Sequence, residues 1–255
     1  MTLWGAGKNA FMRFWYGHVR RMNLVWPSIT VHGKRLVIHP EVYKPLENEH
    51  ICAEYCHEGD RVLDLGCGSG VGAIFCASKA REVVAVDVSS AALENTEENC
   101  RLHGVTNVSV VRSDMFSNVP GKFDLILANP PYIEADFPSE TQQFATSVRY
   151  LPLLFSQMGE HLTGRGRVLI QFPMWFKGRI KKLAAQHGMK VVQVRRMPAK
   201  SPGLFLLSVA YMQVGFRSAL YLLEPVAVAK PAKASQAAPK ASAPRQAKAK
   251  AAVPA

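Results

Sequence analysis

The tetrapeptide Asn129-Pro130-Pro131-Tyr132 has the residue types best suited to chemistry in this sequence. Two consecutive prolines stiffen the backbone and remove two N–H donors, so the carbonyls point in fixed directions. The Asn129 amide oxygen and the Pro130 carbonyl can each accept one hydrogen from an NH2 group, and the Tyr132 ring can pack on a flat acceptor. The alternative is a rigid turn that only ends a strand.

Such acceptors fit one kind of reaction. An amide or aromatic amine nitrogen is a poor nucleophile because its lone pair is delocalised. Two fixed oxygens position this nitrogen and favour the positive charge that builds on it during attack on a sulfonium methyl group. No strong general base is required, because the proton becomes acidic once the methyl is transferred. We therefore predict Asn129, Pro130 and Tyr132 as catalytic residues for methyl transfer to a planar NH2 group.

The glycine-rich segment from Asp64 to Gly70 is the expected place for the methyl donor. Gly66, Gly68 and Gly70 remove side chains where a ligand must lie on the backbone. Asp87 follows roughly 20 residues after the first glycine, where a carboxylate can bind a ribose diol. The glycines also fit a looser dinucleotide pattern, but a cationic donor without phosphate would gain from an acid such as Asp64. The segment therefore favours S-adenosyl-L-methionine as cofactor.

Two further residues are expected at the adenine ring, and no metal is expected. Asp114 follows the third expected strand and could accept the adenine amino hydrogen, while the Met115 backbone N–H donates to the ring. The alternative for Asp114 is a turn-forming role. The chain has 5 cysteines, none in a CxxC or Cys/His metal spacing. Reduced thiols are typical of a cytoplasmic protein.

The surrounding sequence predicts the elements that position these residues. Apolar runs predict strands at 62–65, 83–86, 108–111, 123–128, 167–172, 189–195 and 204–212, and helical patterns occupy about 72–79, 90–103, 149–162 and 175–187. Alternating strands and helices predict an α/β fold: a Rossmann-like, seven-stranded mixed sheet with helices on both faces. The last strand is expected to be antiparallel, because no helix is expected between it and the strand before it.

Composition divides the chain into three expected regions: an N-terminal extension at 1–40, a single α/β domain at 41–215, and a disordered tail at 225–255. Phe11, Phe14, Trp15 and His18 form a helical stripe in the extension. The tail is rich in Ala, Pro and Lys and carries six basic residues and no acid, half of the net charge of +12. It could contact nucleic acid. No apolar run is long enough for a transmembrane helix, so no membrane partner is expected.

These motifs resemble the class I S-adenosylmethionine-dependent methyltransferases over about residues 41–212, and within them the small-domain N-methyltransferases with an NPPY motif. The stretch from His39 to Glu49 is similar to the segment before the glycine loop in HemK-type protein-glutamine methyltransferases. One branch of these has Val-Tyr-x-Pro-x-x-Asp-Thr, where this chain ends in Asn48-Glu49. The resemblance implies that this segment covers cofactor and acceptor. Glu47 or Glu49 could then bind the methionine ammonium; the equal alternative is that these acids provide the negative charge that stabilises the start of a helix.

Four functions remain open from the sequence. The first is methylation of a protein glutamine amide, with a release factor or another protein as partner. The second is methylation of an exocyclic amine in RNA or DNA, which the net charge and the basic residues at 177–182 favour. The third is methylation of a small molecule, and the fourth is a non-enzymatic nucleic-acid-binding module. The intact Asn-Pro-Pro-Tyr argues against the fourth.

Overall fold

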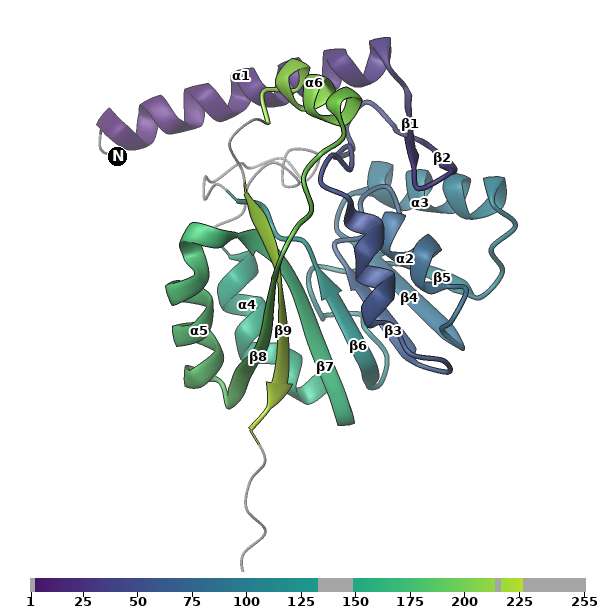
Figure 1. Cartoon of the computed structure of the whole chain (residues 1–255), viewed down its shortest axis with the longest axis vertical. Coiled ribbons are helices and arrows are strands. Elements are labelled where there is room, and N and C mark those ends of the chain that lie inside the picture. The colour runs from purple at the N-terminus through teal and green to yellow at the C-terminus, as the bar shows by residue number, and fades with distance from the viewer. Residues whose placement is uncertain (1–2, 133–148, 214–216, 227–255) are drawn as a thin grey trace, which may run out of the picture.

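The computed structural model describes residues 3–132, 149–213 and 217–226, and its centre is a seven-stranded mixed sheet (Figure 1). The strand order is β5-β4-β3-β6-β7-β9-β8. The strands are β3 Arg61–Leu65, β4 Glu82–Asp87, β5 Val108–Arg112, β6 Phe123–Ala128, β7 Leu162–Pro173, β8 Met189–Arg196 and β9 Ser218–Pro225. β9 alone runs antiparallel to its neighbours β7 and β8. The predicted Rossmann-like α/β fold is confirmed.

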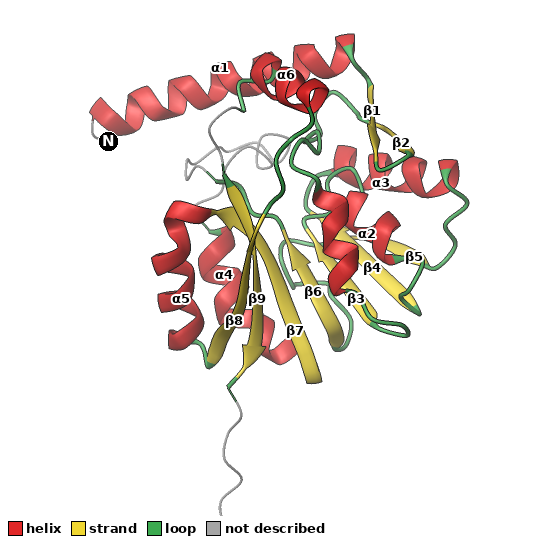
Figure 2. Cartoon of the chain, in the orientation of Figure 1, coloured by secondary structure: helices red, strands yellow, loops and turns green. Residues whose placement is uncertain are grey.

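Helices cover both faces of this sheet (Figure 2). They are α2 Val71–Cys76, α3 Ser90–Leu102, α4 Tyr150–Gln157 and α5 Lys177–Gln186, with short 3-10 turns at Glu49–Tyr55, Met158–His161 and Met174–Phe176. Successive strand residues point to opposite faces: Leu63 packs in one core with α4 and α5, whereas Val62 packs with α2 and the 49–55 turn. Burial on both sides explains why β6 is apolar at nearly every position.

The expected strand at 204–212 is wrong, because Pro202–Ala210 forms helix α6. Ser201 caps this helix by accepting a hydrogen bond from the Leu204 N–H (3.3 Å), and Pro202 occupies the first helical turn. An uninterrupted apolar run does not distinguish a buried strand from a helix. The final strand is β9, which begins at Ser218, so the sheet continues past the expected domain end at 215.

The N-terminal segment forms helix α1, Leu3–Val25, and a hairpin of β1, Ser28–Val31, and β2, Lys34–Val37. Helices α1 and α6 lie together across the carboxyl end of the parallel strands (Figure 1). The Trp15 indole N–H donates to the Tyr211 carbonyl (3.1 Å), and the His18 ring lies 2.6 Å from the Ala210 carbonyl. None of the described helices is long and apolar enough to span a bilayer. The expected tail falls outside the described residues from 227 onward.

Candidate functional site

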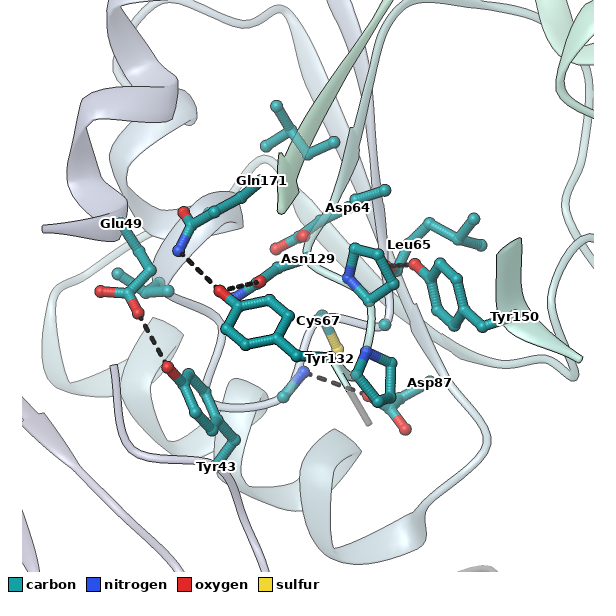
Figure 3. Close-up of a pocket in the computed structure, with 18 of the residues that line it drawn as sticks. Tyr43, Glu49, Asp64, Leu65, Cys67, Asp87, Asn129, Tyr132, Tyr150 and Gln171 are labelled. Carbon is teal, nitrogen blue, oxygen red and sulfur yellow. Dashed lines mark hydrogen bonds between the residues drawn. The ribbon is translucent and has the colours of Figure 1, made fainter. Parts of the chain in front are cut away.

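A cavity of about 350 Å³ lies where β3, β4 and β6 end (Figure 3). Open α/β sheets place ligands at this edge. Nine of the predicted site residues line it: Asp64, Gly66, Gly68, Asp87, Asp114, Met115, Asn129, Pro130 and Tyr132. The structure therefore brings the two motifs, which are far apart in sequence, into one site.

Gly70 is the predicted cofactor residue that does not line this cavity. It has a φ of 77°, and a Cβ there would lie 2.9 Å from Thr96 Cγ2 on α3. Gly70 therefore allows the loop to turn into α2 and pack closely on α3. Gly66 also has a φ of 77°, and it packs against the ring of Tyr150, whose hydroxyl donates to the Leu65 carbonyl (2.6 Å).

Asp64 is buried at the end of β3 and ties this strand to α2. Its Oδ2 accepts a hydrogen bond from the Ala73 N–H (2.9 Å), and burial raises the pKa of its carboxyl to about 7. A cationic group bound nearby would stabilise the charged form and lower this pKa again. This environment suits a positively charged ligand better than an anionic one.

Gly72→Ala is expected to destabilise the protein by about 1–3 kcal/mol, because the new Cβ would lie 2.8 Å from Asp64 Oδ2. Urea unfolding of the full chain measures this loss. The matched control is Gly178→Ala in α5, where a Cβ meets nothing within 4 Å. There the better helix propensity of alanine should keep or slightly raise stability. Equal free energies of unfolding for Gly72→Ala and Gly178→Ala would contradict the close packing of Gly72 against Asp64.

Asp87, at the end of β4, holds the glycine loop with its carboxylate. Its Oδ2 accepts from the Gly68 N–H (3.1 Å), and its Oδ1 accepts from the Ser89 N–H (3.0 Å). Burial raises the pKa of Asp87, and these two backbone hydrogen bonds oppose that rise. Each oxygen has a further lone pair, so the carboxylate can still accept two hydroxyl hydrogens from a ribose.

Asp114 and Met115 lie on the loop after β5. The Asp114 side chain is about half exposed and pairs with Arg149 across the cavity mouth (3.4 Å). Met115 has a φ of 52°, in the left-handed region that few residues other than glycine adopt. Both line the cavity, and the adenine contact predicted for them stays a prediction.

The Asn129–Tyr132 corner directly follows β6. The Tyr132 hydroxyl lies 3.2 Å from Asn129 Oδ1 and 3.5 Å from Glu47 Oε2. The Tyr132 ring meets Phe172 edge-on, with ring centroids 5.6 Å apart. Burial raises the pKa of Tyr132 well above its usual value, so its hydroxyl keeps its proton at neutral pH.

The two acids before the glycine loop have different surroundings. Glu49 accepts hydrogen bonds from the N–H groups of Leu46 (3.2 Å) and Glu47 (2.9 Å), and from the Tyr43 hydroxyl (3.3 Å). It thus braces its own loop, and burial followed by the charge of Glu47 raises its pKa to about 7. Glu47 instead faces Tyr132 and lies 3.7 Å from Lys200 Nζ.

Sequence reasoning missed several residues that line or brace the cavity. Gln171 Nε2 (3.4 Å) and Ser218 Oγ (3.2 Å) both donate to the Tyr132 hydroxyl. Helix α1 contributes Phe11, Met12 and Trp15 to the wall. The aromatic stripe in the sequence includes Phe11 and Trp15, and no sequence pattern indicated Met12. Across the described residues there is no cluster of three or more His, Cys, Asp or Glu that could hold a metal ion.

Comparison with known proteins finds similarity to methyltransferases. Residues 49–171 match the family model described as Methyltransferase small domain. A Methanocaldococcus jannaschii protein with the provisional name protein N5-glutamine methyltransferase is 42% identical over 108 residues, which are 41% of this chain and 54% of that protein. The ribosomal protein L11 methyltransferase of Thermotoga petrophila is 49% identical over 78 residues, 30% of this chain and 29% of that protein. The chain thus spans about half or less of these relatives.

Solved structures share the fold at low sequence identity. A methyltransferase from Pyrococcus furiosus superimposes with a TM-score of 0.57 at 19% identity, covering 82% of this chain and 98% of that one. The tRNA m1G37 methyltransferase of M. jannaschii gives a TM-score of 0.55 at 16% identity, covering 78% and 56%. At these identities the likeness concerns the fold alone.

Proposed function

We propose that this chain, whose residues 49–171 match the methyltransferase small domain family, transfers a methyl group from S-adenosyl-L-methionine to a planar NH2 nitrogen. The observation that carries the proposal is the shared cavity. Asn129, Pro130 and Tyr132 line it together with Asp64, the glycine-rich loop that follows β3, and Asp87. The further proposal is that the acceptor is a protein glutamine amide.

The residues of the cavity fit this cofactor. Asp87 offers lone pairs to a ribose diol, and the positive-φ glycines leave the backbone open beside it. Asp64 provides a carboxylate near the place of the methionine cation. When bound, S-adenosyl-L-methionine supplies an electrophilic methyl group on its sulfonium. The chain's own contribution is then to bind, orient and desolvate the acceptor.

The acceptor is held at the Asn129–Tyr132 corner. Asn129 Oδ1 and the Pro130 carbonyl accept the two N–H hydrogens, and the Tyr132 ring packs on the acceptor plane. These oxygens stabilise the positive charge that develops on nitrogen during transfer. The proton lost afterwards leaves through solvent, since the methylated nitrogen is strongly acidic.

Two observations support a protein acceptor. The M. jannaschii relative carries a name for glutamine methylation. In addition, large apolar side chains are exposed on the two helices that lie across the carboxyl end of the parallel strands (Figure 1); this lid patch consists of Phe11, which also lines the cavity, and Phe14 on α1, and of Phe205, Leu206 and Val209 on α6. Large exposed apolar surfaces are typical of protein contacts, and they favour a polypeptide acceptor over a nucleic acid.

Labelled S-adenosyl-L-methionine incubated with the chain and a cell extract tests the acceptor class. We expect label that survives nuclease, is lost to protease, and appears as N5-methylglutamine after complete enzymatic digestion to amino acids. Label lost to nuclease would identify an exocyclic base amine instead. That alternative is favoured by the exposed basic residues of α5, Lys177, Arg179, Lys181 and Lys182, and it predicts strong salt sensitivity of acceptor binding.

Leu206→Gln is expected to raise KM for the protein acceptor about tenfold, because burying a leucine stabilises a contact by about 1.5–3 kcal/mol. Leu206 is 70% exposed, so the folded state should tolerate the change. Steady-state kinetics with the purified acceptor, together with calorimetric binding of S-adenosyl-L-methionine, provide the measurement. Leu102→Gln at the end of α3, 49% exposed, is the matched control and should leave KM unchanged. Equal KM values for both variants would refute the lid patch as acceptor surface.

A further inference from the structure

The Tyr132 hydroxyl has four polar groups within 3.5 Å, and two of them compete to accept its single hydrogen. Figure 3 shows the contacts with Asn129 and Gln171. Gln171 Nε2 and Ser218 Oγ donate to its oxygen, at 3.4 and 3.2 Å. Its single hydrogen then has two candidate acceptors, Asn129 Oδ1 at 3.2 Å and Glu47 Oε2 at 3.5 Å. The hydroxyl can therefore exist in two states that differ only in the direction of this hydrogen.

The first state conflicts with acceptor binding. The shorter contact uses Asn129 Oδ1, the same oxygen that the proposed function assigns to an acceptor N–H. An amide oxygen has two lone pairs, but a hydrogen bond already donated to it reduces the charge that it offers to a second donor. Since the developing positive charge is stabilised by that oxygen, a phenol hydrogen on it weakens the stabilisation.

The second state removes the conflict. Glu47 is only 4% exposed, and Lys200 Nζ lies 3.7 Å from its Oε1. Lys200 is itself held by a hydrogen bond to Ser208 Oγ (2.8 Å). Burial raises the pKa of Glu47, and hydrogen bonding from Ser218 and the charge of Lys200 oppose that rise. In its charged form this carboxylate is a stronger acceptor than a neutral amide. It can take the phenol hydrogen as soon as an acceptor NH2 competes for Asn129.

We infer that Glu47 is a positioning residue that accepts the Tyr132 hydroxyl hydrogen, so that the Asn129 oxygen is free to bind the acceptor NH2 group. The hydroxyl turns about its C–O bond, and no proton is transferred. Gln171 and Ser218 fix the phenol oxygen while its hydrogen changes partner. This inference rests on the proposed function, and it differs from a role of Glu47 at the methionine ammonium.

The test is a double-mutant cycle of Glu47→Gln and Tyr132→Phe with the methylated acceptor. Glu47→Gln should lower kcat/KM about tenfold to a hundredfold, the equivalent of one charge-assisted hydrogen bond. Affinity for S-adenosyl-L-methionine should stay within about twofold. In the Tyr132→Phe background there is no hydroxyl to redirect, so the same Glu47→Gln change should cost less than about threefold. Glu49→Gln, on the same loop but hydrogen-bonded to the backbone N–H groups of Leu46 and Glu47 and not to the Tyr132 hydroxyl, should have the same effect in both backgrounds.

Three results would overturn the inference. Equal losses from Glu47→Gln with and without the Tyr132 hydroxyl would show that Glu47 acts independently of it. A large rise in Kd for S-adenosyl-L-methionine would place Glu47 at the cofactor. Absence of methyl transfer by the wild-type protein would refute the proposed function, and the inference with it. This outcome is distinct from the first two, because it is seen without any variant.

Discussion

Asn129→Ala is expected to lower kcat/KM for methyl transfer by about a hundredfold to a thousandfold, while Kd for S-adenosyl-L-methionine changes less than about threefold. The variant removes the oxygen that accepts an N–H of the acceptor, and removing one preorganised charge-stabilising group costs on this order. The residues proposed to bind the cofactor at the ends of β3 and β4 remain in place, because Asn129 follows β6 and accepts its hydrogen bond from Tyr132. Single-turnover methylation and calorimetric cofactor binding separate the two effects.

Asn129→Asp is the matched comparison for this position. The carboxylate keeps an oxygen in the place of the amide oxygen, so we expect activity between that of the wild type and Asn129→Ala. Turnover of Asn129→Ala within tenfold of the wild type would remove Asn129 from the acceptor site. Thermal unfolding of all three proteins shows whether any loss reflects folding, since Asn129 is partly buried.

The local motifs could be predicted from the sequence because their function depends on the backbone. Gly66 and Gly68 mark a turn between a strand and a helix, and consecutive prolines fix the end of β6 wherever the rest of the chain lies. The positions of Asp64 and Asp87 follow from the same rule, since both end parallel strands and such ends meet at one edge of the sheet. Their shared cavity was therefore foreseeable.

The surroundings of Tyr132 could not be predicted, because distant segments build them. Ser218 reaches the tyrosine only because β9 inserts between β7 and β8, with Ser218 paired to Pro173. The sequence predicted the last strand at 204–212, which left Ser218 outside the sheet. Pattern alone also did not separate Glu47 from Glu49, since both are acids on one short loop that lines the cavity, and only the fold shows that Glu47 is the one beside the Tyr132 hydroxyl.

Asp87→Ala is expected to raise Kd for S-adenosyl-L-methionine at least about a hundredfold. Two hydrogen bonds from the ribose diol to a charged group are lost, each worth about 1.5–3 kcal/mol, and the Gly68 N–H loses its partner. Calorimetric titration measures this change, and kcat at saturating cofactor should stay within about fivefold because the Asn129 corner is untouched.

Asp87→Asn separates the two contributions. The amide keeps one oxygen for a backbone N–H or a hydroxyl but loses the charge, so its affinity should lie between those of the wild type and Asp87→Ala. Burial raises the pKa of Asp87, so the native carboxyl binds its proton more readily than in the unfolded chain. Because a bound diol prefers the carboxylate, cofactor affinity should fall as the pH drops through this raised pKa in the wild type. Asp64, whose pKa burial raises to about 7, adds a pH dependence of its own, and Asp87→Asn should keep only that part. An identical pH dependence of the wild type and Asp87→Asn would mean that another group holds the ribose.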